Sequence, residues 1–336
     1  MDFNLLLNIL KGKSLENDLD NFMDINLPNK SQIEYNEPCP EPTDLRISTI
    51  TAICNINTDI KLNIIYDKIN IDNNIKYIEY GEKNKGTPVK KISKKKLKKK
   101  KIFFNQTTII INISPSRYVN TKIFRNGKIQ MTGLKSEEEG YKTVDILINK
   151  LRLINSTYDL KKETKQKENP ISNPHKMKLT DFRIVLVNTD FNVNFKIKRV
   201  DLHKILINKY NLFSKYEPCI YPGVDTKFYY NEKYDNDGLC HCHKKCNGKG
   251  NGVDEGDCKK ITIAAFQSGS IIITGARNLK QVSVAKNFIN EVIKENYLSI
   301  KKILPSFVKE KLNKPKKRKS KKFYIKKSDI INIYND

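Results

Sequence analysis

Apolar and polar positions alternate along several short stretches of this chain, and other apolar residues recur at helical spacing. Residues 45–54, LRISTITAIC, alternate and are rich in β-branched side chains, so they predict a strand. The same criteria predict strands over 103–113 and 181–187 and helices over 59–69 and 200–209. The pattern therefore indicates a mixed fold in which helices cover a sheet.

One motif occurs twice. FRNGKIQMTGLKSEEE spans 124–139 and FQSGSIIITGARNLKQ spans 266–281, with Phe, Gly, Ile, Thr and Gly in register. In each copy one glycine permits a turn before a short strand, and a second lets the backbone swing into a helix. One supersecondary unit has therefore been used twice.

A helix is expected behind each copy of the motif. Ser136 with Glu139, and Asn278 with Gln281, are capping-box pairs that mark the helix starts. Apolar residues then follow at helical spacing in both copies: Val144, Leu147, Ile148, Leu151 and Ile154, and Val282, Ala285, Ile289, Val292 and Ile293. Each helix is thus expected to bury one face against the preceding strands.

Composition divides the 336 residues into five segments. Residues 1–44 carry nine acids and three bases and predict a flexible acidic arm, with an irregular cap on the fold as the alternative. The other segments are a first repeat over 45–155 with a Lys-rich insertion at 76–102, a linker over 156–180, a second repeat over 181–297 with a Cys-rich insertion at 231–260, and a basic tail over 298–336.

The net charge of +26 favours a polyanionic partner, although AT-rich codon usage alone would enrich a chain in Lys, Asn and Ile. Residues 90–101 hold nine lysines and predict a solvated loop, which could also touch phosphates. No run of about twenty apolar residues and no secretory signal occur, so we expect a soluble intracellular protein without a membrane partner.

Four of the seven cysteines fall in the 231–260 insertion, and they predict a structural zinc site in a reducing compartment. The predicted ligands are Cys240, Cys242, Cys246 and Cys258, with His241 and His243 as alternatives for one of them. Four thiolates complete a tetrahedral zinc shell, and metal binding would order a loop that has few apolar residues. The spacing CxCx3Cx11C is not a common finger pattern, so a disordered loop without metal is the alternative.

The two motif copies resemble the TATA-box-binding protein family, whose repeats carry F-x-S-G-K-x-x-x-T-G-A-K-S-E. YEPCIYPG at 216–223 is similar to the family's YEPELFPG, and the likeness covers about 45–155 and 180–297. The resemblance implies an α+β fold, a pseudo-symmetric saddle of two repeats, each a curved antiparallel sheet with helices on the convex face, plus the small Cys-rich insertion. The concave sheet would lie in a widened minor groove and bend the DNA, as this family does with aromatic wedges.

The resemblance also implies roles for particular residues. The wedges would be Phe104 with Phe124 in the first repeat and Tyr221 with Phe266 in the second. Groove-edge contacts would come from Thr132 and Thr274, an apolar floor from Ile47, Val185 and Ile272, and phosphate contacts from Lys128, Lys135 and Arg277. Glu217 and Ile220 would contact a transcription-factor-B-like protein.

Several positions depart from the family pattern. Leu45 and Arg183 stand where the family keeps asparagines, and Gln130 stands where an apolar floor residue is expected. Tyr221 replaces a Phe, and Cys219 replaces an acid. These departures leave the DNA sequence preference open.

The leading hypothesis is a promoter-binding transcription initiation factor without enzymatic activity. Its partners would be double-stranded promoter DNA, a transcription-factor-B-like protein and RNA polymerase. It would be a monomer on DNA, and a dimer of the free protein is left open. The insertions resemble divergent members from large DNA viruses, which implies a viral factory or virion, and otherwise a nucleus.

Two other functional classes, an enzyme and an adaptor, share parts of this pattern. The same half-saddle is part of some DNA glycosylases and ribonucleases, but the chain has no helix-hairpin-helix, no carboxylate cluster and no nucleophile beside a base. A zinc-bearing adaptor with the same fold would have lost specific DNA binding. In that case Lys135 and Arg277 would point away from the open side of the sheet.

Overall fold

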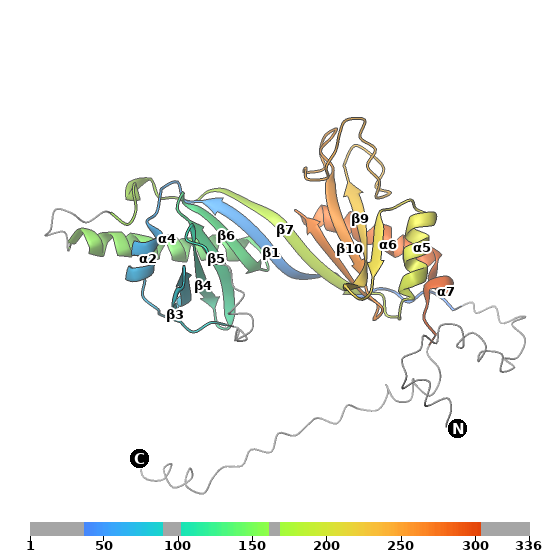
Figure 1. Cartoon of the computed structure of the whole chain (residues 1–336), viewed down its shortest axis with the longest axis horizontal. Coiled ribbons are helices and arrows are strands. Elements are labelled where there is room, and N and C mark those ends of the chain that lie inside the picture. Colours follow the sequence, from blue (N-terminus) through green and yellow to red (C-terminus); the bar gives the residue numbers. More distant parts are fainter. Residues whose placement is uncertain (1–36, 90–101, 161–168, 304–336) are drawn as a thin grey trace, which may run out of the picture. The chain divides into compact units, whose positions relative to one another are not determined.

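The computed structural model describes residues 37–89, 102–160 and 169–303 (Figure 1). The chain separates into two compact units, Met1–Cys39 and Pro40–Asp336, and every described helix and strand belongs to the second. Most of the predicted acidic arm, the lysine run and most of the basic tail lie outside the described residues.

Eleven strands form one sheet in the order β3-β2-β4-β5-β6-β1-β7-β11-β10-β9-β8. The first copy supplies β1 (Arg46–Asn55), β2 (Ile75–Tyr80), β3 (Lys83–Gly86), β4 (Gln106–Ser114), β5 (Arg117–Phe124) and β6 (Lys128–Leu134). The second copy supplies β7 (Thr180–Asn192), β8 (Ser214–Glu217), β9 (Tyr221–Tyr230), β10 (Lys259–Ala265) and β11 (Ser270–Ala276). All pairings are antiparallel, and the copies join where β1 pairs with β7.

Helices pack on one side of each copy (Figure 1). They are α2 (Leu62–Lys68) and α4 (Glu137–Leu160) in the first copy, the short η1 (Pro174–Lys176), and α5 (Arg199–Asn208), α6 (Leu279–Glu295) and α7 (Tyr297–Ile300) in the second. The ten apolar residues predicted to line α4 and α6 are all buried. Each buried Val, Leu or Ile among them contributes about 1.5–3 kcal/mol, so packing on the sheet stabilises these helices. The predicted α+β class and duplicated unit are confirmed.

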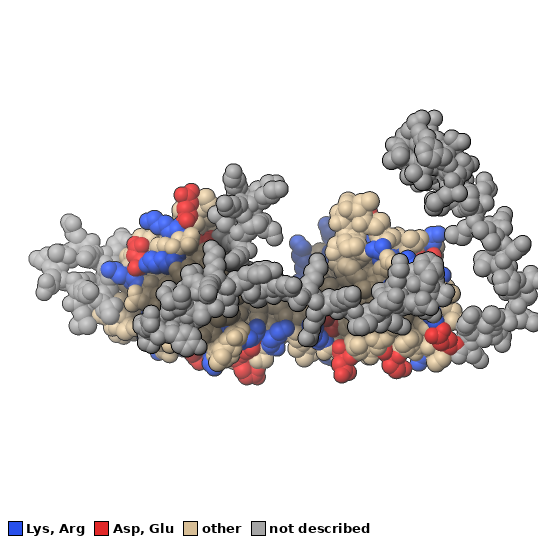
Figure 2. Space-filling view, turned by 90° about the horizontal axis from the view of Figure 1, so that it is seen from below, with Lys and Arg blue, Asp and Glu red and all other residues tan. Residues whose placement is uncertain are grey.

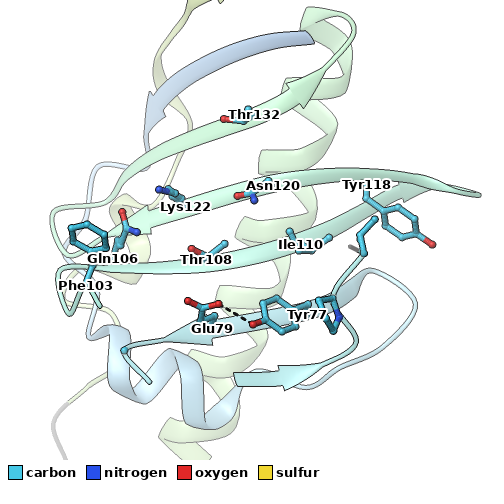
Figure 3. Close-up of a pocket in the computed structure, with 13 residues that line it drawn as sticks. Tyr77, Glu79, Phe103, Gln106, Thr108, Ile110, Tyr118, Asn120, Lys122 and Thr132 are labelled. Atoms are coloured by element: carbon cyan, nitrogen blue, oxygen red, sulfur yellow. Dashed lines mark hydrogen bonds between the residues drawn. The ribbon is translucent and has the colours of Figure 1, made fainter. Parts of the chain in front are cut away.

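The strands bury one face and leave the other uncovered. In β5, Val119, Thr121 and Ile123 are buried, whereas Asn120 and Lys122 lie on the opposite side of the sheet, away from α4 (Figure 3). We call this uncovered side the open face. Its residues in the first copy are Gln106, Thr108, Ile110, Asn120, Lys122, Phe124, Gln130 and Thr132, and in the second copy Asp225, Lys227, Tyr229, Thr262, Ala264, Ile272 and Thr274.

Both predicted capping pairs form. The Gln281 backbone N–H donates to Asn278 Oδ1 at 2.9 Å, and the Glu139 N–H donates to Ser136 Oγ at 3.4 Å. The side chains of Glu139 and Gln281 accept a bond from the backbone N–H of the residue before each cap, at 2.7 and 2.8 Å. The two motif copies therefore start their helices with the same hydrogen-bond pattern.

The first glycine of the motif serves one purpose in both copies. Gly127 has φ of 74° and Gly269 has φ of 88°, in the left-handed region that favours glycine. A Cβ on either would lie 2.3 or 2.2 Å from a backbone carbonyl oxygen, of Thr58 or Phe195 respectively. Only glycine fits this turn, which is why the residue recurs in register.

Segment boundaries differ from the prediction in three places. The stretch 76–102, predicted as an insertion, begins with most of β2 and includes β3, because Ile78 is buried and β2 pairs with β4. Part of the predicted linker packs on the first copy, where Ile171 is fully buried and pairs with Ile60. The predicted tail begins inside α7, whose Ile300 is also buried.

Candidate nucleic-acid interface

Two aromatic rings meet at one end of the second copy's open face. Tyr221, at the start of β9, and Phe266, just after β10, have ring centroids 5.7 Å apart at 71°. Tyr221 is 42% exposed and Phe266 is half-buried, so the pair lies at the surface. A Cβ at Gly223 would lie 2.9 Å from the Tyr221 ring and 3.2 Å from the Phe266 ring. The glycine of YPG therefore makes room for both predicted wedges.

Arg199 of α5 bonds to the residues that follow the two rings in the chain. Its guanidinium donates to the Pro222 carbonyl and, at 3.0 Å, to Gln267 Oε1, and each acceptor follows one of the rings in the chain. Burial and the nearby Asp225 carboxylate raise the pKa of Tyr221 above its ordinary value. The ring therefore presents a neutral hydroxyl at its tip.

The first copy does not bring its two predicted wedges together. Phe124 is half-buried on the open face, where Gln106 lies opposite it. By strand register Gln106 occupies the position of Gly223 in the second copy, so a long side chain stands where the other copy leaves space. Phe104 is 57% exposed and packs edge-on against Tyr80, with centroids 6.1 Å apart.

A hollow of about 670 Å³ lies on the open face of the first copy (Figure 3). Thr108, Asn120 and Lys122 line its floor, and Phe103, which is 50% exposed, lies at one end. Phe103 is an aromatic residue of the open face that the sequence interpretation missed. The doublet at 103–104 does not reveal which ring turns toward the sheet, because both precede the strand.

The predicted groove-edge threonines occupy matching positions on β6 and β11. Thr132 is exposed on the open face, and Thr274 donates a hydrogen bond to the side-chain oxygen of Asn188 on β7. The contact of Asn188 with the open face was not predicted from the sequence. Bulges in the pairing of β7 change which residues face each side of the sheet, so simple alternation does not place Asn188. Of the positions that match family asparagines, Leu45 precedes β1 and Arg183 is exposed on β7.

The three predicted floor residues separate. Ile272 is half-buried on the open face. On β7, Leu186 pairs with Thr51 and Ile184 pairs with Ala52, and the register shifts between these two pairs. Val185 lies at this shift. Ile47 pairs with the fully buried Thr189, and cross-strand partners share a face, so Ile47 lies on the helix-covered side. This placement corrects the floor role predicted for Ile47.

Two of the three predicted phosphate-binding bases are engaged within the protein. Lys135 Nζ donates to the carbonyl oxygens of Ile47 and Ser48, both at 2.6 Å, and Arg277 donates to the Lys249 carbonyl at 3.2 Å. Lys128 is exposed at the start of β6. In Figure 2, which views the molecule from below Figure 1, basic and acidic side chains are interspersed over the described surface.

Asp190 of β7 is an acidic group on the sheet, and it is neutralised locally. Its carboxylate accepts bonds from Arg46, at 2.7 and 3.0 Å, and from the Ser48 hydroxyl. Burial alone would raise the pKa of Asp190, but these bonds outweigh it and hold the pKa below its ordinary value. Asp190 therefore remains a carboxylate with its charge paired.

The predicted partner-binding residues form an exposed turn between β8 and β9. Ile220 is 80% exposed, and Glu217 ends β8 and forms an ion pair with Lys215 at 2.9 Å. Cys219 is exposed between them. Ile220 therefore places an exposed apolar side chain at this turn.

The four predicted cysteine ligands converge. The sulfur atoms of Cys240, Cys242, Cys246 and Cys258 all lie within 4.8 Å of one another. His241 instead contacts the Asp237 carboxylate at 2.9 and 3.0 Å. The structure therefore favours an all-cysteine set over the histidine alternatives.

Donor groups surround these sulfur atoms. The Gly256 backbone N–H donates to Cys242 Sγ at 3.2 Å, and the Asn231 amide donates to Cys258 Sγ at 3.6 Å. Burial raises the pKa of Cys240 and of Cys258, whereas at Cys246 backbone bonds from Gly248 and Cys258 outweigh burial and lower the pKa. Donors directed at thiolates are the surroundings that a metal-bound cysteine needs, so the residues fit the predicted group.

Comparison with known sequences gives matches to one family. Residues 181–296 match the sequence model of the family described as "Transcription factor TFIID (or TATA-binding protein, TBP)". A "TATA-box-binding protein-like" protein of Acanthamoeba polyphaga mimivirus is 31% identical over 274 residues, which cover 78% of this chain and 68% of that protein. The solved Methanococcus jannaschii TBP has a TM-score of 0.41 and 18% identity, covering 75% of this chain and 99% of that one.

These findings define a duplicated α+β transcription factor. The chain belongs to the TATA-box-binding protein family and is a divergent member of it. Among the helices in the described ranges, none combines the length and the apolar character that crossing a membrane requires.

Proposed function

We propose that this protein is a non-enzymatic transcription initiation factor that binds and bends A·T-rich promoter DNA through the minor groove. The observation that carries the proposal is the exposed pair Tyr221–Phe266 at the end of the open face, with Gly223 leaving space for it. Flat apolar rings at a surface can insert between base pairs and replace part of the lost stacking. Rings that served only packing would be sealed under the helices.

The first copy takes part through Phe124 and an aromatic residue from the 103–104 doublet. Phe104 is the wedge that the family resemblance implies, and its ring contacts Tyr80 at the end of β2. We propose that it leaves this contact when DNA binds, because the ring is more than half exposed and little apolar area is lost. Phe124 already lies on the open face.

The remaining contacts follow from the open face. Thr132 would donate to a base-edge acceptor, and Thr274 would do so after its hydroxyl turns away from Asn188. Ile272 and Val185 would line the apolar floor, and Lys128 would hold a phosphate. These contacts distinguish A·T from G·C pairs but read little beyond that, because the minor groove offers a degenerate pattern.

Partner binding is proposed at the turn between β8 and β9. Ile220 would fit an apolar pocket of a transcription-factor-B-like protein, and Glu217 would add a charged contact at the rim. RNA polymerase would then be recruited through that partner. The bound protein would be a monomer.

We further propose that zinc is held by the four cysteines of the insertion. Four thiolate donors within 4.8 Å of one another suit the tetrahedral shell that zinc prefers, and zinc would supply order to the loop rather than catalysis. The described insertion also bonds to the fold, since Gln281 Nε2 donates to the Asn251 carbonyl at 2.7 Å.

The relative from a mimivirus supports a viral origin for this chain. On that basis the protein would act in a viral factory of the host cytoplasm or be carried in the virion. A cellular protein of this class would act in the nucleus.

A second candidate is a zinc-bearing transcription adaptor that keeps the fold without specific DNA binding. It is favoured by the engagement of Lys135 and Arg277 with backbone carbonyls, which leaves fewer bases directed at a phosphate backbone. The exposed ring pair favours the first candidate, because an adaptor has no need of it.

The test is the affinity of the full chain for an A·T-rich duplex, measured by gel shift. Phe266→Ala should weaken binding by about fivefold or more, since stacking of a base on an aromatic ring contributes about 1–3 kcal/mol. Tyr141→Ala, which removes an exposed ring on α4, on the helix-covered side of the sheet, is the matched control and should bind like the wild type. Equal affinity of all three proteins would exclude the wedge role, and absence of binding would favour the adaptor.

A further inference from the structure

The two copies have the same strand register on the open face but different chemistry. Lys122 on β5 pairs with Gln130 on β6, and the matching positions on β10 and β11 are Ala264 and Ile272. The correspondence is fixed by the neighbouring pair, Ile123 with Ile129 in the first copy and Ala265 with Ile271 in the second. One half of the floor is therefore polar where the other is apolar.

The next open-face pair repeats the contrast more mildly. Asn120 lies opposite Thr132 in the first copy, and Thr262 lies opposite Thr274 in the second. An amide thus replaces a hydroxyl. The first copy carries two amide side chains within two neighbouring cross-strand pairs, and the second copy carries none there.

The polar groups of the two halves also differ in availability. Across the described ranges, the side chains of Asn120, Lys122 and Gln130 make no hydrogen bond or ion pair, and the 670 Å³ hollow opens above the first two of them (Figure 3). In the second half, Lys227 bonds to Asp225 at 2.7 Å and to Thr262 at 3.0 Å. The first half therefore has free donors and acceptors, whereas those of the second half are mutually satisfied.

Minor-groove chemistry gives this difference a consequence. A·T pairs present only acceptors there, whereas a G·C pair adds the guanine N2 amine as a donor. An apolar pair such as Ala264 and Ile272 cannot accept from that amine, so it would be buried without a partner at a cost. The amide oxygen of Gln130 can accept from it, and Lys122 can donate to the acceptors beside it.

From this contrast we infer that the two halves read different base pairs: the first copy accepts and favours a G·C pair at the step facing Lys122 and Gln130, whereas the second copy requires A·T. This inference rests on the proposed minor-groove function. An A·T-rich element with G·C on one side then fixes the direction in which the protein sits on the DNA. Direction of binding sets the direction of transcription from such an element.

The experiment compares three duplexes with the full chain: a symmetric A·T core, the same core with one G·C pair in one half, and the core with a G·C pair in both halves. The single G·C duplex should bind at least as tightly as the A·T core. The double G·C duplex should bind about tenfold more weakly or worse, since one half must then meet a mismatched pair. Replacing each guanine with inosine, which lacks the amine, should remove both effects.

Two reciprocal variants assign the effect to the named residues. Gln130→Leu should make a single G·C pair costly in either half, measured as the ratio of the variant's affinities for the single G·C duplex and for the A·T core. Ile272→Gln should restore binding to the double G·C duplex, a gain that misfolding cannot produce. If the second G·C pair weakens binding by the same factor as the first, and neither variant changes these factors, the inference is overturned while the proposed function stands. If no duplex binds, the proposed function itself fails.

Discussion

Gln281 connects three parts of the second copy, so its replacement gives a measurable change in stability. Its side chain is 2% exposed, Oε1 accepts from the Arg277 N–H at 2.8 Å, and Nε2 donates to the Asn251 carbonyl at 2.7 Å. Gln281→Met keeps the side-chain volume but removes the partners of two part-buried backbone groups. A fully buried orphaned group costs about 1–3 kcal/mol and partial exposure lowers that cost, so we expect a loss of about 2 kcal/mol.

The assay is urea unfolding of the full chain followed by far-UV circular dichroism. For a dependence on urea of about 2–3 kcal/mol per molar, the midpoint should fall by about 1 M. Glu291→Met introduces the same side chain at an exposed position of α6 and should leave the midpoint unchanged. A midpoint for Gln281→Met equal to that of the control would refute the role assigned to these two bonds.

Two further predictions concern ionisation and metal. Arg117 bonds to Glu139 at 2.8 Å and holds the pKa of Glu139 below its ordinary value. The folded state therefore binds that proton more weakly than the unfolded chain, and stability present above about pH 4.3 is lost as the pH falls through the folded pKa. Glu139→Gln should lower the urea midpoint at neutral pH, and its midpoint should fall less steeply than that of the wild type as the pH is lowered. Parallel curves of midpoint against pH for the two proteins would contradict this. The purified protein should hold about one equivalent of zinc, and Cys258→Ser should remove it and make the insertion sensitive to protease. Less than about a third of an equivalent in the wild type, with unchanged protease sensitivity after chelation, would exclude the metal site.

Local signals in the sequence were sufficient to predict the turns and helix starts of the repeated motif. The capping pairs at Ser136 and Asn278 depend on residues three positions apart, and Gly127 and Gly269 are required by a turn within each copy. Each of these features depends mainly on chain neighbours. Their prediction therefore needed no knowledge of how distant strands pair.

Features that depend on strand register could not be predicted in the same way. Whether Ile47 faces the floor or the helices depends on bulges in the pairing of β1 with β7. Whether a ring packs beside Phe124 depends on Gln106 standing opposite it. The orientations of Lys135 and Arg277 depend on carbonyl groups supplied by β1 and by the insertion.

The short hairpin of β2 and β3 was missed for another reason. Its apolar residues are few, since Ile75, Tyr77 and Ile78 supply the buried positions of β2 and β3 has none. The lysine run that follows outweighed this weak alternation. Pairing of β2 with β4 is what stabilises the hairpin, and that contact spans about thirty residues of sequence.

The proposed function requires that aromatic rings of the open face insert between base pairs and bend the duplex. Fluorescence energy transfer between dyes at the two ends of a short A·T-rich duplex measures this directly, with the unmodified full chain added to saturation. Energy transfer should rise on binding, because the ends approach as the duplex kinks. Saturable binding with no change in transfer would contradict it.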